Sequence, residues 1–156
     1  MDETRITRTV ELDAGPDDVW RAIAEPELLG EWLGSTVDLD LRPGGDGVIV
    51  ESDGAVRRAR VDEVEPARRL ALRWWPDDGS GPESTVELDL EPVVGGTRVV
   101  VTETLAPVPG SASASVAADR WNVRLLLLGC CVLRTGCVPE RSAGCVPERS
   151  TSLACG

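Results

Sequence analysis

The sequence contains no histidine, lysine, tyrosine or phenylalanine among its 156 residues. Without histidine, neither a Ser-His-Asp nor a Cys-His catalytic system can form, and imidazole is missing as a metal ligand. Without lysine there is no Schiff-base nucleophile and no phosphate-binding Walker lysine. The missing tyrosine removes one more general acid. Polar chemistry therefore depends on carboxylates, arginine, serine, threonine and cysteine.

The sequence also has no long apolar run and no excess of basic charge. The longest apolar segment, residues 125–133, is too short to cross a bilayer, and the first residues lack the apolar stretch of a secretory signal. A net charge of −11 disfavours nucleic acids and anionic membrane surfaces, because both attract basic proteins. We therefore expect a cytoplasmic protein with reduced cysteines, no membrane insertion and no nucleic-acid partner.

The spacing of apolar residues predicts an α+β domain whose sheet is antiparallel. Pro16 with Asp17 and Asp18 marks a helix start, and Pro26 opens a second short helix. Between them and the last helix, apolar and polar residues alternate and every connection is of hairpin length, which requires antiparallel strands. The predicted segments are a strand at 5–12, helices from Pro16 and from Pro26, six strands within 36–103, and a long helix over 116–132.

A sheet with one apolar face needs a partner, so we expect about seven strands to curve around the long C-terminal helix. Asp119, Arg120 and Arg124 fall mostly outside the apolar face of that helix. The expected domain covers residues 1–134. Residues 136–142, Gly-Cys-Val-Pro-Glu-Arg-Ser, recur unchanged as 144–150. Two short copies cannot form a solenoid, and their glycine and proline content predicts a disordered tail over 135–156.

Glu103 is the carboxylate most suited to a functional role. It lies late in the last predicted strand, in phase with apolar residues, so alternation turns it toward the interior. A desolvated glutamate there could have a raised pKa and act as an acid or a base. Alternatively, the strand end reaches solvent or Glu103 pairs with an arginine. Glu51 and Arg73 are weaker candidates, and Arg73 is expected to point outward.

The five tryptophans supply all the aromatic character of the sequence. Tryptophans on apolar faces are typical of a core, although in a cavity fold the core lining is also the pocket wall. The predicted pocket residues are Trp32, Trp74, Trp121, Leu28, Leu88, Val101, Glu103, Leu125 and Leu128.

The cysteines do not predict a metal site. Cys130 and Cys131 fall in the last helix, while Cys137, Cys145 and Cys155 take their spacing from the duplicated segment, which contains no C-x-x-C motif. We predict no metal and no cofactor.

A series of short motifs, taken together, resembles the SRPBCC (START-like, helix-grip) superfamily. Within it the sequence is most similar to the family homologous to the C-terminal domain of the activator of heat-shock-protein-90 ATPase. The resemblance covers about residues 5–133, and its motifs are Pro16–Trp20, Pro26–Leu28 with Trp32, Arg42–Gly45, Glu65–Pro66 with Leu70 and Trp74, Gly96–Thr97 with Glu103, and Trp121.

This resemblance implies a sheet curled around the last helix with a cavity between them. Members include lipid, hormone and polyketide binders, polyketide cyclases and the co-chaperone itself, and they share no catalytic motif. The aromatic residues common on the strands of the family are leucine or valine here.

Three functions remain open from the sequence. The first is non-catalytic binding of a small apolar or amphipathic molecule in the cavity. The second is a polyketide cyclase- or dehydratase-like enzyme that uses a cavity carboxylate, Glu103 or Glu51. The third is a chaperone-linked interaction module that uses the acidic surface, with a chaperone or a second copy of the chain as partner.

Overall fold

The computed structural model describes residues 4–33, 35–106 and 113–145, with side chains for 4–33, 36–106 and 117–134. Three helices and a sheet of seven strands make up this part of the chain. The elements are β1 (Thr4–Leu12), α1 (Pro16–Ala24), α2 (Pro26–Leu33), β2 (Ser35–Leu39), β3 (Asp46–Glu51), β4 (Val56–Glu65), β5 (Arg69–Pro76), β6 (Ser84–Val93), β7 (Gly96–Leu105) and α3 (Ser113–Cys145).

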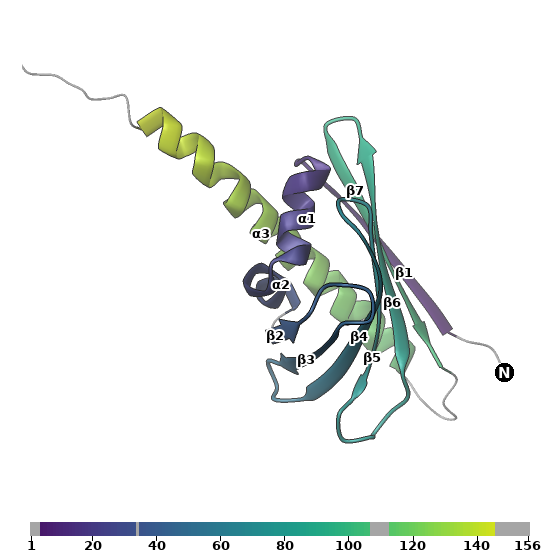
Figure 1. The fold of residues 1–156 in the computed structure, drawn as a ribbon. Coiled ribbons are helices and arrows are strands. Elements are labelled where there is room, and N and C mark those ends of the chain that lie inside the picture. Colours follow the sequence, from purple (N-terminus) through teal and green to yellow (C-terminus); the bar gives the residue numbers. More distant parts are fainter. Residues whose placement is uncertain (1–3, 34, 107–112, 146–156) are drawn as a thin grey trace, which may run out of the picture.

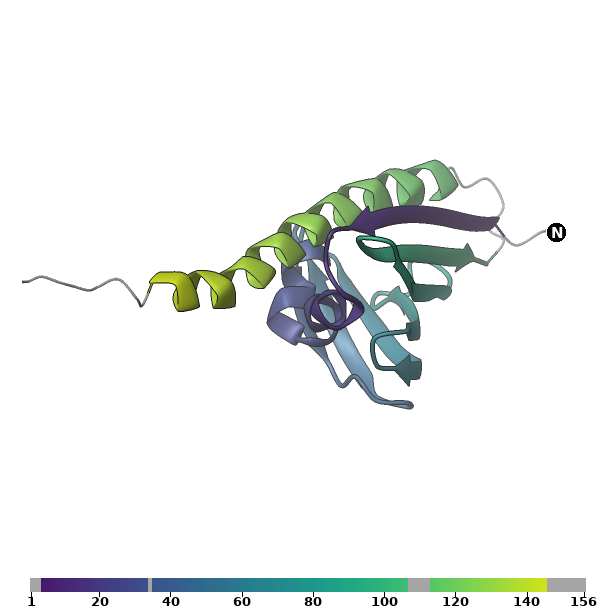
Figure 2. The same ribbon diagram turned by 90° about the horizontal axis from the view of Figure 1, so that it is seen from above.

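The strands form one sheet in the order β1-β7-β6-β5-β4-β3-β2, and every neighbouring pair is antiparallel. Strands β2 to β7 follow one another as hairpins, whereas β1 joins at the edge beside β7, where Val10 lies opposite Val99. The sheet curves, and α3 lies across its concave side together with α1 and α2 (Figures 1 and 2). The predicted α+β class and element order are confirmed.

The two short helices are fixed to each other by an indole. α1 begins with Pro16 at its first turn and carries Asp17 and Asp18 there, as the sequence predicts. In α2, the Trp32 Nε1–H donates a hydrogen bond of 3.0 Å to the Ala22 carbonyl of α1. Since Trp32 is 1% exposed, this bond satisfies a buried donor and sets the position of the ring.

Asp53 and Gly54 lie in the turn between β3 and β4. Gly54 has φ +91°, which L side chains rarely adopt, and Asp53 Oδ1 accepts a 2.9 Å bond from the Ala55 N–H. The Glu51 N–H donates to the Ala55 carbonyl at 2.8 Å. This closed turn fixes the end of β3 and therefore the position of Glu51.

Arginines on the convex face of the sheet are used in ion pairs between strands. Arg73 pairs with Asp62 and points outward, as expected. The other pairs join Arg58 to Asp77, Arg60 to Asp46, Arg98 to Glu11 and Glu91, and Arg69 to Glu63, Glu87 and Asp89. These ion pairs make the convex face polar, whereas most side chains turned toward the helices are apolar.

α3 continues farther than the sequence pattern predicts. The expected helix covered residues 116–132, but helical backbone extends through Gly136 and Pro139 to Cys145. These residues predicted an end because glycine is flexible and an internal proline loses one backbone hydrogen bond. A helix satisfies most of its remaining backbone groups internally and can therefore extend beyond the core, as the yellow end of α3 does in Figure 2. Residues 146–156 of the predicted tail lie outside the described residues.

Candidate ligand-binding site

A row of polar and aromatic side chains crosses one end of the concave face. Each member continues the inward alternation of its own strand, so neighbouring strands bring these residues together. The row consists of Glu51 on β3, Arg57 on β4, Trp74 on β5, Ser84 on β6 and Glu103 on β7.

Glu103 lies beneath two tryptophan rings. Its side chain faces the interior and is 5% exposed. Its Oε1 accepts a 3.0 Å hydrogen bond from Trp74 Nε1–H, and its Oε2 accepts a 2.6 Å bond from Trp121 Nε1–H. The two rings are stacked, with centroids 5.9 Å apart and planes inclined by 18°. The carboxylate thus positions both indoles, and each of its oxygens has a partner.

Arg124 lies over both of these rings. Its guanidinium carbon lies 5.3 Å from the Trp74 centroid and 5.1 Å from the Trp121 centroid, and Arg57 lies 5.0 Å from Trp74. These are cation–π distances, and the attraction is strongest where water is excluded. Arg124 is 5% exposed. Burial lowers the pKa of Arg124 to about 10, so it still carries its charge at neutral pH.

Glu51 holds three arginines with one oxygen. Its Oε1 lies 2.9 Å from Arg57 Nε, 2.9 Å from Arg124 Nη2 and 3.8 Å from Arg120 Nη1. Burial opposes ionisation of this carboxyl, but the charges of Arg57, Arg124 and Arg120 outweigh it and lower the pKa of Glu51. The cluster of these four side chains is therefore ionised at neutral pH and carries an excess of positive charge.

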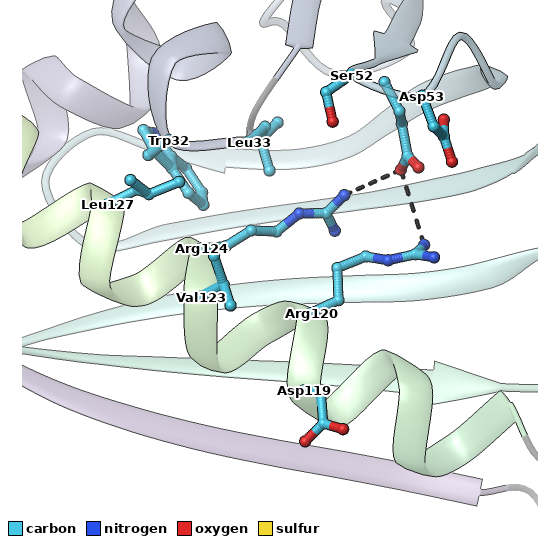
Figure 3. A pocket seen from close by; sticks show the side chains of 10 residues that line it. Trp32, Leu33, Ser52, Asp53, Asp119, Arg120, Val123, Arg124 and Leu127 are labelled. Atoms are coloured by element: carbon cyan, nitrogen blue, oxygen red, sulfur yellow. Dashed lines mark hydrogen bonds and ion pairs between the residues drawn. The ribbon is translucent and has the colours of Figure 1, made fainter.

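A pocket of about 460 Å³ opens beside this cluster, between α3, the end of α2 and the β3–β4 turn. Its apolar wall is formed by Trp32, Leu33, Val123 and Leu127. Val123 and Leu127 are 57% and 40% exposed, so apolar surface faces the opening. Figure 3 shows this wall beside the guanidinium groups of Arg124 and Arg120, which come from successive turns of α3.

The polar wall consists of charged residues and Ser52. Glu51, Arg120 and Arg124 belong to the cluster described above, and Asp53 and Asp119 lie at the rim. In Figure 3 the dashed lines mark the two ion pairs from α3, while Asp119 points away from the guanidinium groups. The pocket therefore combines an apolar wall with a few charged groups, as small-molecule sites do.

The predicted pocket residues have different positions in the structure. Trp32 lines this pocket, and Leu28 is half-buried against the core. Glu103 and its two indole partners do not line the pocket, but Arg124, which does, lies against both indoles. The rest, Leu88, Val101, Leu125 and Leu128, are buried in the core with Trp74 and Trp121.

The sequence did not identify Arg120, Arg124, Val123 and Leu127 as pocket residues. The expectation that Arg124 falls outside the apolar face of the last helix is wrong, because it is buried against the two tryptophans. Arg124 lies three residues after Trp121 and four before Leu128, and these spacings share one face of a helix. The position of Arg124 on the same helix face as apolar residues could therefore have predicted that its charge is buried.

Neither a metal cluster nor a membrane-spanning helix is found in the described residues. No group of three or more histidine, cysteine, aspartate or glutamate side chains there could hold a metal ion. Cys130 is exposed and Cys131 is buried, and burial raises the pKa of the Cys131 thiol. Within the described part of the chain, no helix is long and apolar enough to cross a membrane.

A curved antiparallel sheet with a long C-terminal helix across its concave side defines the helix-grip class of SRPBCC proteins. The family model described as "Activator of Hsp90 ATPase homolog 1-like protein" matches residues 13–127, and the chain belongs to this family. A search of curated proteins finds no match.

Solved structures share the fold at low sequence identity. Protein MLL2253 from Mesorhizobium loti has a TM-score of 0.77 at 24% identity, over 85% of this chain and 98% of that protein. The Aha1 dimer from Colwellia psychrerythraea has a TM-score of 0.66 at 19% identity, over 81% and 93%. DynU16, a protein of the dynemicin biosynthetic locus, has a TM-score of 0.75 at 26% identity, over 85% of this chain and 48% of DynU16. This chain thus spans about half the length of DynU16.

Proposed function

We propose that this protein binds a small amphipathic molecule in the pocket beside Glu51 and Arg124, without catalysing a reaction. The observation that carries the proposal is the composition of the pocket walls: exposed apolar side chains of α3 and buried Trp32 face an ionised arginine cluster. A ligand with an apolar body and a polar end would cover these apolar side chains with its body and contact the arginine cluster with its polar end. The similarity to DynU16, a protein of a biosynthetic locus, is consistent with a small-molecule ligand.

The layered arrangement beneath the pocket supports binding. Glu103, the stacked indoles and the guanidinium groups hold one another, so the floor of the pocket is ordered before a ligand arrives. A preorganised site loses less conformational entropy on binding. Among the side chains that line the pocket, Trp32 and Arg124 are therefore held in place by hydrogen bonds and, for Arg124, by contact with the indole rings.

The two candidate carboxylates are poorly suited to acid–base catalysis. Both oxygens of Glu103 accept hydrogen bonds from indoles, and Glu103 does not line the pocket. The pKa of Glu51 is lowered, whereas a general acid at neutral pH needs a raised one. The geometry therefore favours the binding function over a cyclase- or dehydratase-like activity.

Native mass spectrometry of freshly purified protein tests the proposal. We expect a small molecule to remain bound, and we expect Leu127→Asp to release it, because the substitution places a charge on the apolar wall. Leu126→Asp is the matched control, since Leu126 is the neighbouring residue, is 71% exposed and does not line the pocket. Wild-type protein without any bound molecule, or equal loss from both variants, would contradict the proposal.

A cytoplasmic location and a chaperone or second copy as partner remain predictions from the sequence. A named relative, the Aha1 dimer, is a pair of chains, but at 19% identity it supports the fold only. Sedimentation at increasing protein concentration would detect self-association, and a single monomeric species throughout would contradict it.

A further inference from the structure

One buried nitrogen in the pocket region lacks a hydrogen-bond partner. This nitrogen is Arg124 Nη1. Among the described side chains, it is the buried nitrogen or oxygen atom that has no hydrogen-bond partner. The other terminal nitrogen, Nη2, donates to Glu51 at 2.9 Å. An unsatisfied buried donor is costly, and more so on a charged group. Arg124 lines the pocket, and an acceptor oxygen of a ligand there would give Nη1 its missing partner once the side chains that now cover this atom shift.

The charges next to this nitrogen favour an anion. Arg57, Arg120 and Arg124 share the single carboxylate of Glu51, although the chain as a whole has a net charge of −11. The rim carboxylate of Asp53 accepts the Ala55 N–H in the turn. The other rim carboxylate, Asp119, points away from the guanidinium groups in Figure 3. Among the described interactions neither carboxylate forms an ion pair with the cluster, although both line the pocket together with Arg120 and Arg124.

The apolar wall defines the rest of the ligand. Trp32, Leu33, Val123 and Leu127 line the same pocket as Arg120 and Arg124. A flexible hydrocarbon or a ring against this wall would remove the exposed valine and leucine surface from water, which stabilises the complex. A purely ionic ligand would leave that surface exposed.

We propose that the pocket binds an amphipathic carboxylic acid, whose carboxylate accepts hydrogen bonds from Arg124 Nη1–H and Arg120 while its apolar part lies along the Trp32–Leu127 wall. The inference rests on the proposed function and names the ligand class of that same site. A carboxylate matches the planar donor geometry of a guanidinium. Glu51 keeps its own contact to Nη2, so the ligand adds to the cluster without displacing it.

Three probes of equal chain length separate charge from apolar contact. Octanoate, octan-1-ol and octylamine are titrated into the full chain by isothermal titration calorimetry at low ionic strength. We expect octanoate to bind about tenfold more tightly than octan-1-ol, because a hydrogen bond to a charged donor contributes about that factor. Octylamine is expected to bind most weakly. The affinity for octan-1-ol, which is uncharged, measures the contribution of the apolar wall to binding.

Variants then identify the responsible arginines. Arg124→Lys keeps the charge but removes the terminal fork, and we expect it to weaken octanoate binding about tenfold. Arg120→Gln, at a side chain that is 36% exposed, is expected to fold and to weaken octanoate binding about threefold, with octan-1-ol unchanged. Arg98→Gln, on the convex face, is the control for net charge.

The outcomes distinguish this inference from the proposed function. If octan-1-ol binds as tightly as octanoate, the carboxylate inference is wrong and small-molecule binding stands. If octylamine binds best, or Arg98→Gln has the same effect as Arg120→Gln, the inference is also wrong. If none of the three probes binds, both the inference and the proposed function fail.

Discussion

At the scale of single residues, the site depends on two carboxylates with different partners, the buried Glu103 and the half-buried Glu51. Glu103 is surrounded by neutral donors, the indole N–H groups of Trp74 and Trp121, at 3.0 and 2.6 Å. Glu51 is surrounded by arginines. The first carboxylate orients aromatic rings and the second gathers cations. Both groups therefore affect stability as well as binding.

The first prediction concerns Glu103→Gln. The amide offers one oxygen and one NH2 group to two indole donors, so one donor loses its acceptor. We expect the free energy of unfolding to fall by about 1–3 kcal/mol, together with a change in tryptophan emission. Urea unfolding measures the change in the free energy of unfolding. Glu91→Gln is the matched control on the convex face, where the side chain is 59% exposed. Equal stability of both variants would contradict the assigned role.

The second prediction concerns pH. The pKa of Glu51 is lowered from 4.5, because its three arginines outweigh the effect of burial. A carboxyl with a lowered folded-state pKa stabilises the fold above its unfolded pKa and loses that contribution as pH falls through the folded value. Glu51→Gln should therefore cost about 2 kcal/mol at neutral pH. This difference from wild type should shrink below pH 4.5.

Thermal unfolding of both proteins across a pH series measures that difference. Glu91→Gln, on the exposed convex face, again serves as control, and its difference from wild type should be small throughout the series. A difference between Glu51→Gln and wild type that stays constant down to strongly acidic pH would show that Glu51 does not contribute through its charge.

At the scale of elements, α3 and the β3–β4 hairpin meet at the site. α3 contributes Arg120 and Arg124 from one face, together with buried Trp121. The hairpin contributes Glu51 and its turn residues. The site is therefore formed only when the hairpin holds Glu51 within reach of α3. The conformation of the turn is the local requirement for this.

The third prediction tests that requirement through Gly54→Ala. Gly54 has φ +91°, and a Cβ there would meet nothing within 4 Å, so the cost comes from backbone conformation alone. We expect a loss of about 1–2 kcal/mol in unfolding free energy and weaker ligand binding. Gly81→Ala is the control, because a Cβ at Gly81 makes ordinary contacts and its φ is not positive. An unchanged Gly54→Ala protein would show that the turn is easily rearranged.

At the scale of the whole molecule, the described core residues of α3 lie between Trp121 and Val132. The last buried apolar residues described on α3 are Leu128, Cys131 and Val132. Beyond them the helix leaves the body in Figure 2. The stability of the domain should therefore depend on the chain up to Arg134, whose guanidinium pairs with Glu31 of α2.

The fourth prediction is that residues 135–156 are dispensable for stability. A chain ending at Arg134 should unfold within about 3 °C of the full chain, since it keeps all the described core residues. A chain ending at Leu127 is the contrasting control, because it lacks Leu128, Cys131 and Val132 and should lose its cooperative transition. Differential scanning calorimetry compares the three proteins. A large loss on truncation at Arg134 would show that the segment is structural.

The sequence predicted most of the fold because its signals are local. Alternation, hairpin-length turns and Pro16 at a helix start depend on neighbouring residues, and they indicated the elements and the antiparallel sheet. The inward orientation of Glu103 followed in the same way. The length of α3 did not, because Gly136 and Pro139 indicate an end that the backbone does not make.

The sequence by itself determined which reactive side chains are present, namely carboxylates and arginines without histidine or lysine. It also determined on which type of element each of them lies. Only the tertiary structure decided which of them meet. Glu51 and Arg124 are far apart in the chain, and their 2.9 Å contact follows from sheet curvature and the placement of α3. The site is thus a product of long-range packing, because side-chain contacts depend on how elements are stacked and not on the local pattern that forms each element.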